Sequence, residues 1–116
     1  MKKMCLLFVS VLLLTGCGKA TIQNIECSEL DQLKEDGAIL IDVRNISEFD
    51  EGHLDDAINI EYDTIGEKIG SVAKDKDTKI IVYCRSGNRS NKAATTLIDK
   101  GYKNVYDLGA MNKCTK

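Results

Sequence analysis

An apolar run that leads into a short polar loop and then into a helix-forming segment constrains this chain more than any other feature. The apolar run spans 79–83, the loop spans 84–90, and the helix-forming residues follow over 91–98. This order predicts a strand, a tight turn and a helix. If the strand belongs to a parallel sheet, Cys84 stands at its carboxyl end, where open α/β sheets place their ligands.

The residues of this loop have the chemistry of an anion site around a thiol. Arg85 and Arg89 bring two positive charges close to Cys84. Free N–H groups at the start of a helix also favour an anion, whether a thiolate, a persulfide or an oxyanion substrate. Gly87 fits a loop that curls around the sulfur, and Ser90 is a favourable helix N-cap. The loop therefore favours a nucleophilic thiolate over the alternative, a structural thiol beside a solvated basic turn.

The first residues of the chain have the features of a secretory signal. Two lysines precede an apolar segment over 4–14 that is short for a bilayer span. Residues 14–17, Leu-Thr-Gly-Cys, resemble the bacterial lipoprotein box, in which cleavage precedes a cysteine that carries the lipid. We expect removal of 1–16, lipidation of Cys17, and export to the extracytoplasmic side of a bacterial membrane. The alternative is an ordinary signal or short anchor with an incidental cysteine.

The charge of the chain limits the partners that it can bind. The chain has 16 basic and 18 acidic residues, and two lysines leave with the expected signal. No basic surplus or alternation of basic and aromatic residues indicates nucleic acid. In a mildly acidic chain, the two arginines of the loop instead indicate a small anionic substrate.

Four cysteines remain after the expected cleavage: Cys17, Cys27, Cys84 and Cys114. None has the short paired spacing of a zinc site or of a thioredoxin-like motif, so we expect no metal. In an oxidising compartment, Cys27 and Cys114 could form a disulfide if the two ends of the domain meet. The alternative, two free thiols, stays open at the level of sequence.

Short apolar runs alternate with helical patterns through the rest of the chain. We expect helices over 28–36, 47–51, 64–72 and 90–100, and strands over 38–44, 57–60, 79–83 and 105–108. The alternation predicts a single compact α/β domain over 28–116, with a largely parallel central sheet flanked by helices. Residues 17–27 would form the lipidated cysteine and a short tether.

Several blocks of this sequence, in order, resemble the rhodanese domain over about residues 28–112. The blocks are 41–44, 48–49, 52–54, 57–60, 82–90, Ala93 and 105–109. The resemblance implies the rhodanese-like fold and a sulfurtransferase. Such an enzyme moves sulfane sulfur from thiosulfate or a related donor to a thiophilic acceptor, such as cyanide or a thiol. It also implies that neither a metal nor an organic cofactor is needed.

The resemblance assigns roles to individual residues. Cys84 would be the nucleophile and persulfide carrier. The substrate-binding residues would be those of the loop after Cys84: Arg85, Ser86, Gly87, Asn88, Arg89 and Ser90. Their backbone N–H groups would surround the sulfur, and Arg85 and Arg89 would bind the anionic donor and the leaving sulfite. Four further residues would support the loops by ion pairs and hydrogen bonds rather than take part in the chemistry: Asp42, Arg44, Glu48 and His53.

Two other functions stay open. A rhodanese-like binding or persulfide-carrier module would hold sulfur for a protein acceptor without turnover on thiosulfate. The related cell-cycle phosphatases have five residues between the cysteine and the arginine of their loop, whereas only four separate Cys84 from Arg89. The shorter loop suits a single sulfur atom, so a phosphatase is the minor alternative.

The sequence also departs from the family pattern. The family commonly has prolines where this chain has Asp55, Asp56 and Glu61, so we expect looser loops. Ala110 and Cys114 stand where a second glycine and a tryptophan are usual. A reaction of a Cys84 persulfide with the Cys114 thiol is a further hypothesis.

Overall fold

Within residues 20–115, five parallel strands form a central sheet in the order β1-β5-β4-β2-β3. The computed structural model describes residues 20–115, so the expected signal and Cys17 lie outside the described residues. The strands are β1 (Gln23–Asn24), β2 (Ile39–Asp42), β3 (Ile58–Asn59), β4 (Lys79–Cys84) and β5 (Asn104–Ala110). The expected parallel sheet is therefore confirmed.

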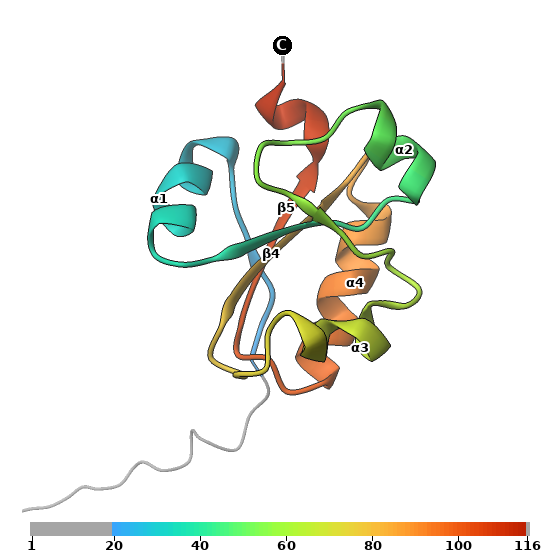
Figure 1. Ribbon diagram of the computed structural model, residues 1–116. Coiled ribbons are helices and arrows are strands. Elements are labelled where there is room, and N and C mark those ends of the chain that lie inside the picture. The colour runs from blue at the N-terminus through green and yellow to red at the C-terminus, as the bar shows by residue number, and fades with distance from the viewer. Residues whose placement is uncertain (1–19, 116) are drawn as a thin grey trace, which may run out of the picture.

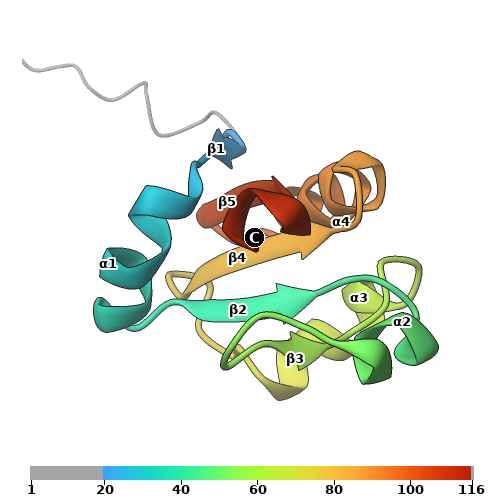
Figure 2. The ribbon, with the colours of Figure 1, turned by 90° about the horizontal axis from the view of Figure 1, so that it is seen from above.

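Within residues 20–115, four α-helices and three short 3-10 helices lie between or after these strands. They are α1 (Leu30–Glu35), α2 (Ile46–Glu51), α3 (Ile65–Lys68) and α4 (Asn88–Asp99), with 3-10 turns at Cys27–Glu29, Ile69–Ser71 and Met111–Cys114. Viewed from above, α1 lies to one side of the sheet, and α3 and α4 lie to the other (Figure 2). The sheet flanked by helices confirms the expected α/β fold.

Burial on both faces explains why β4 reads as a continuous apolar run. Every residue from Ile80 to Cys84 is fully buried. Val82 and Cys84 belong to one core cluster with Leu97 of α4, and Tyr83 belongs to a second with Leu30 of α1. A strand covered on both faces has no polar side, so its sequence does not alternate.

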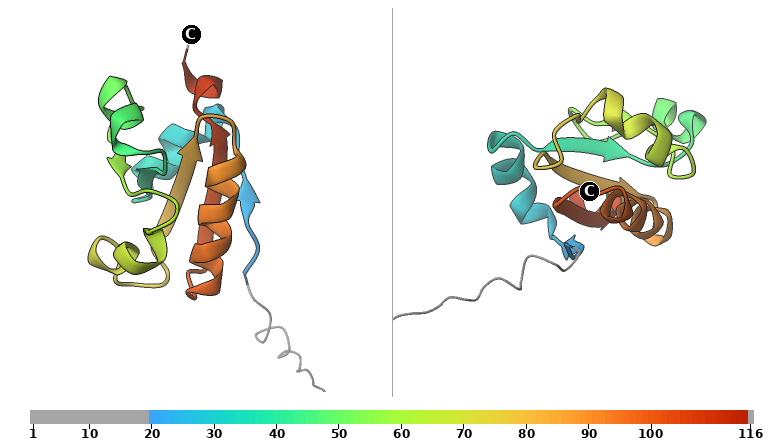
Figure 3. Two further views of the ribbon diagram at one scale, coloured as in Figure 1. Left: turned by 90° about the vertical axis from the view of Figure 1, so that its right-hand side faces the viewer. Right: turned by 90° about the horizontal axis from the view of Figure 1, so that it is seen from below.

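The edge strand β1 lies in the segment that the sequence predicted to be a tether. Gln23 and Asn24 pair in parallel with Tyr106 and Asp107 of β5, which places β1 at the edge of the sheet (Figure 3). Ile25, directly after β1, is buried in the core. The prediction of a simple tether over 17–27 is thus corrected, because its last residues already belong to the domain.

Two expected helices differ in form. Residues 64–72 form the short helix α3 followed by a 3-10 turn, with Gly66 and Gly70 inside the segment. The first helix begins as a 3-10 turn whose capping box joins Glu26 and Glu29, not Ser28 and Asp31. In both places the apolar spacing predicted a helical segment but not how its turns are divided.

A disulfide joins the two ends of the domain. Cys27, after β1, is bonded to Cys114, after β5, with their Cα atoms 5.4 Å apart. The sequence left this pairing open against two free thiols. Because Cys114 is already bonded, it offers no thiol to a Cys84 persulfide, and that hypothesis is corrected.

Candidate active site

The sulfur of Cys84 lies in a cradle of backbone N–H groups at the carboxyl end of β4. Its Sγ accepts hydrogen bonds from the N–H of Gly87 at 2.9 Å and of Ser90 at 3.3 Å. The end of β4, the start of α4 and helix α2 gather at one end of the sheet (Figure 1). Two donors aimed at one sulfur stabilise negative charge on it.

The backbone of Gly87 makes this cradle possible. Gly87 has a φ of 102°, a left-handed conformation that side chains disfavour, and it directly precedes α4. The turn at Gly87 sends the chain back over the sulfur and starts the helix at once. The helix therefore begins at Asn88, two residues earlier than expected.

Ser90 is not the N-cap that the sequence predicted. It lies in the first turn of α4, is fully buried, and its hydroxyl donates to the carbonyl of Gly87 at 3.1 Å. The N–H of Ser90 donates to the Cys84 sulfur, and this is possible because Ser90 lies inside the first turn of α4 and not before it. Its hydroxyl, bonded to the carbonyl of Gly87, holds the loop in place.

Both arginines of the loop bind the carboxylate of Glu48. Arg89 donates from Nη1 to Oε1 at 2.8 Å and from Nη2 to Oε2 at 3.1 Å. Arg85 donates from Nη2 and Nε to Oε2, at 3.2 and 3.3 Å. The hydrogen bond from Arg89 is the largest influence that lowers the pKa of Glu48, to about 2, and the same bond raises the pKa of Arg89. Glu48 is thus an anion at neutral pH.

Local structure holds Glu48 in this position. It is the third residue of α2, and its N–H donates to the side chain of Asn45 at 2.9 Å. Its own carboxylate accepts the N–H of Asn45 at 3.2 Å, which completes a capping box. The sequence predicted Glu48 as a loop support but not its two partners.

Asp42 and Arg44 form a buried ion pair at the carboxyl end of β2, beside β4. Arg44 donates from Nη2 to Asp42 Oδ2 at 2.7 Å and from the same nitrogen to the carbonyl of Gly52 at 2.7 Å. The hydrogen bond to Asp42 raises the pKa of Arg44. Asn59, which the sequence reasoning missed, donates to the carbonyls of both residues at 2.9 Å. This pair joins the end of β2 to the end of α2.

The remaining site candidates have simpler surroundings. The ring of His53 stacks on Phe49, and its Nδ1 is 2.9 Å from the carbonyl of Phe49. That contact suits the structural role expected for His53, which stays a prediction. Ser86 and Asn88 are exposed at the rim of the loop. Between residues 20 and 115, no group of three or more His, Cys, Asp or Glu residues could hold a metal ion.

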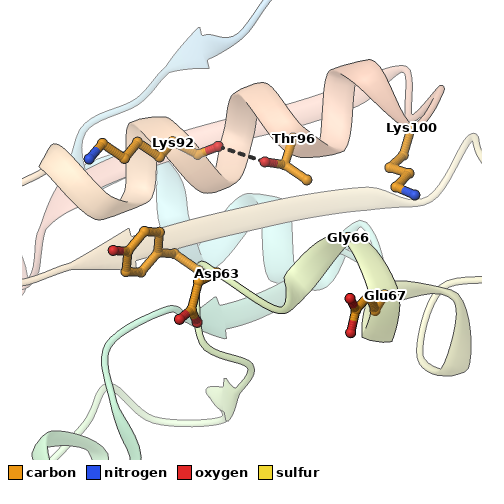
Figure 4. A pocket seen from close by; sticks show the side chains of 7 residues that line it. Asp63, Gly66, Glu67, Lys92, Thr96 and Lys100 are labelled. Carbon is orange, nitrogen blue, oxygen red and sulfur yellow. Dashed lines mark hydrogen bonds between the residues drawn. The ribbon is translucent and has the colours of Figure 1, made fainter.

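A separate hollow runs between α3 and α4 (Figure 4). It has a volume of about 360 Å³. Its lining residues are Tyr62, Asp63, Gly66, Glu67, Lys92, Thr96 and Lys100. None of the loop residues 84–90 belongs to this lining, so the hollow lies on the flank of the molecule and not at the thiol.

The fold and this loop define a known class of protein. The family model of the rhodanese-like domain matches residues 26–114, and the chain belongs to this family. It is 34% identical over 88 residues to the thiosulfate sulfurtransferase GlpE of Pseudomonas aeruginosa, covering 76% of this chain and 78% of that protein. The family resemblance seen in the sequence is confirmed.

Similarity extends to larger proteins and to solved structures. The chain is 39% identical over 89 residues to the tRNA uridine(34) hydroxylase of Sodalis glossinidius, covering 72% of this chain. It spans only about a quarter of the length of that protein. A rhodanese from E. coli, solved with anions, has a TM-score of 0.65 and 30% identity, covering 68% of this chain and 93% of that one.

Proposed function

We propose that this protein is a sulfurtransferase that carries sulfane sulfur as a persulfide on Cys84. The observation that carries the proposal is the cradle, in which two backbone N–H groups point at the Cys84 sulfur. The same donors can stabilise a thiolate or the terminal sulfur of a persulfide. Arg85 and Arg89 supply positive charge for an anionic donor at the mouth of the loop.

The reaction with thiosulfate needs no group beyond the loop. The Cys84 thiolate attacks the outer sulfur of thiosulfate and forms a new S–S bond. The old S–S bond breaks, and sulfite leaves with its electron pair. Cyanide or a thiolate then attacks the terminal sulfur of the persulfide and releases Cys84 as a thiolate. Neither step consumes an outside oxidant or reductant, so we expect no cofactor.

A persulfide carrier or binding module is the second candidate. Cys84 is fully buried in this structure, so a donor or acceptor reaches its sulfur only when the groups that cover it move. A protein acceptor that docks on the rim could cause that movement where a small thiol could not. The similarity to a domain of larger tRNA uridine hydroxylases fits such partners too.

Mass spectrometry of the purified full chain separates these functions. After incubation with thiosulfate, we expect a gain of one sulfur mass on Cys84 and release of thiocyanate over many turnovers with cyanide. Cys84→Ser should give neither product. The double variant Cys27→Ser/Cys114→Ser keeps Cys84 and should still react. Together, the two variants would assign the added sulfur to Cys84.

Other results would change the conclusion. A stable persulfide without turnover would favour the carrier. Hydrolysis of an aryl phosphate that depends on Cys84 would favour the phosphatase. No adduct and no hydrolysis would leave a module that only binds partners.

We also propose that the protein is exported and held at a bacterial membrane through a lipid on Cys17. The disulfide between Cys27 and Cys114 supports an oxidising compartment. Among residues 20–115, no helix has the length and apolar character to cross a bilayer. Cells grown with a labelled fatty acid should label the wild-type protein but not Cys17→Ser. Absence of label from the wild type would exclude the lipid.

A further inference from the structure

The charge of the active-site loop is reduced by a residue outside it. Arg85 and Arg89 are the only charged side chains of the loop 84–90, and both bind Glu48. These three side chains together carry a net charge of one positive unit, not two. The neighbouring ion pair of Asp42 and Arg44 adds no net charge.

We propose that Glu48 selects the sulfur donor by charge, favouring singly charged sulfane-sulfur anions over the thiosulfate dianion. The proposal rests on the sulfurtransferase function argued above. With the Cys84 thiolate counted, the site is neutral before a donor binds, so every negative charge on the donor is in excess. A dianion therefore meets stronger repulsion from Glu48 and the thiolate than a monoanion does. Suitable donors are thiosulfonates and persulfides, in which the group bonded to the sulfane sulfur has no charge of its own.

The geometry makes Glu48 a direct competitor of the donor. Its two carboxylate oxygens already accept four N–H groups from the arginines. An incoming anion must share or displace those bonds, because a guanidinium has a limited number of N–H groups and a planar shape. The Glu48 side chain is only 16% exposed, whereas that of Arg85 is 67% exposed. Arg85 can therefore turn toward a donor while Glu48 stays in place.

Glu48 cannot easily leave the site. Its capping box with Asn45 fixes it at the start of α2, and Arg89 binds it through two nitrogens. Its charge thus persists while a donor binds. A side chain free to swing into solvent would not impose a lasting charge penalty.

The chemistry is the same for both donor classes. With a thiosulfonate, the Cys84 thiolate attacks the outer sulfur, an S–S bond forms, and the S–S bond of the donor breaks. The leaving group is then a sulfinate monoanion, where thiosulfate would release a sulfite dianion. The leaving groups differ in charge and in intrinsic reactivity, so the change of the donor ratio between variants reports how the site treats the charge.

Thiosulfate and methanethiosulfonate make a matched pair of probes, because a methyl group replaces one charged oxygen. The measurement is kcat/KM for each donor on the full chain with cyanide as acceptor. We expect wild type to prefer methanethiosulfonate. Glu48→Gln should raise kcat/KM for thiosulfate relative to methanethiosulfonate by about tenfold, the size expected for one nearby charge that is partly screened.

Glu61→Gln is the matched control. The Glu61 carboxylate accepts the N–H of Ile46 at 3.1 Å, also at the start of α2, and its removal takes away the same unit of charge. We expect the ratio of the two donors to stay within about twofold of wild type, because solvent screens a charge that does not contact the arginines. A shift as large as that of Glu48→Gln would show a general field effect and overturn the proposal.

A role in positioning alone predicts another result. If Glu48 only orients the arginines, Glu48→Gln slows both donors by the same factor and leaves their ratio unchanged, which overturns the proposal. Circular dichroism checks the fold of the variant. Should it not fold, Glu48→Met replaces it, because it removes the same charge and keeps a side chain of similar length, and we expect the same rise in the ratio for thiosulfate. An unchanged ratio there also overturns the proposal.

Failure of the parent function is distinguishable from failure of this inference. If neither donor produces a persulfide on Cys84 in wild type, the sulfurtransferase function fails and charge selection falls with it. If both donors produce a persulfide on Cys84 and Glu48→Gln leaves the donor ratio unchanged, only the proposal of charge selection fails.

Discussion

The backbone at Gly87 couples the stability of the loop to its chemistry. Its φ of 102° is costly for alanine, while a Cβ there would meet only Gly109 at 3.8 Å. The cost is therefore conformational and not steric. Gly87→Ala should lower the free energy of unfolding by about 1–2 kcal/mol, and it should slow persulfide formation because the N–H turns from the sulfur.

Gly70→Ala is the control for this prediction. Gly70 has open space around its Cα and needs no left-handed backbone, so alanine should leave stability unchanged or slightly raised. Urea denaturation and the rate of persulfide formation are the measurements. Equal effects of the two substitutions would contradict the role given to the Gly87 backbone.

Glu48 should make stability depend on pH in an acidic window. Its pKa is lowered from 4.5 to about 2 in the folded protein, chiefly by the hydrogen bond from Arg89. The charged form is therefore stabilised by folding, fully above about pH 4.5, and the benefit disappears as pH falls toward about 2. Glu48→Gln should cost about 1–2 kcal/mol at pH 6, after allowance for screening of partly exposed pairs.

The measurement is urea denaturation of wild type and Glu48→Gln at several pH values. The difference in free energy of unfolding should be largest above about pH 4.5 and should shrink steadily below it. High salt should also reduce it, because Arg85 is mostly exposed. A difference that stays constant from pH 6 to pH 2 would show that the carboxylate charge is not what stabilises the fold.

Single residues were predictable where a local pattern identifies them. Cys84 was placed correctly because an apolar run ends at it. The partners of Glu48 were not predictable, because 37 and 41 positions separate it from Arg85 and Arg89. Ser90 was misplaced as an N-cap, since the start of α4 depends on the backbone conformation of Gly87.

At the scale of elements, the buried pair of Asp42 and Arg44 joins β2 to the end of α2. Asp42→Ala would leave the guanidinium of Arg44 buried without its counter-charge. We expect a loss of about 3–5 kcal/mol in the free energy of unfolding. Urea denaturation measures this loss, and the loss should also loosen α2, which carries Glu48.

The double variant Asp42→Ala/Arg44→Met tests the reason for that loss. It removes both charges and keeps an apolar side chain of similar length, so it should recover much of the stability. A double variant less stable than Asp42→Ala would instead show that the contact of Arg44 with the carbonyl of Gly52 dominates.

Elements were predictable in proportion to their apolar content. The buried strands β2 and β4 and the amphipathic helix α4 have long apolar patterns, and the sequence placed each of them. Strand β1 has only two residues, both polar and exposed, and it exists because β5 offers a free edge. Such a strand has no signal of its own, since its stabilising contacts are distant in sequence.

At the scale of the whole molecule, the disulfide joins the two ends of the domain, and the spacing of apolar residues in the sequence does not predict it. Cys27 and Cys114 are separated by 87 positions, so the bond constrains nearly all of the unfolded domain. Cys27→Ser/Cys114→Ser should lower the free energy of unfolding by about 4 kcal/mol. Denaturation of wild type with and without reductant is the measurement, and reduced wild type should match the double variant.

A small effect would contradict this expectation. Equal midpoints of oxidised and reduced protein would show that the parallel sheet alone accounts for the stability. The α/β architecture with a parallel sheet was predictable, because strands alternate with helices along the chain. The meeting of the two chain ends was not, since it depends on β1 and β5 becoming neighbours.

The disulfide also determines how the domain responds to a pulling force. If tension acts between the two ends of the chain, the bond between Cys27 and Cys114 bears it, and the sheet inside the closed loop stays slack. Among residues 20–115, only 20–26 and Thr115 lie outside that loop, so β1 is the one strand of the described sheet that such a force can pull away. Reduction would release a further contour of about 300 Å, given about 3.5 Å for each extended residue. The domain between the two cysteines therefore barely lengthens under force while the disulfide is intact, and it can unfold and extend once the disulfide is reduced.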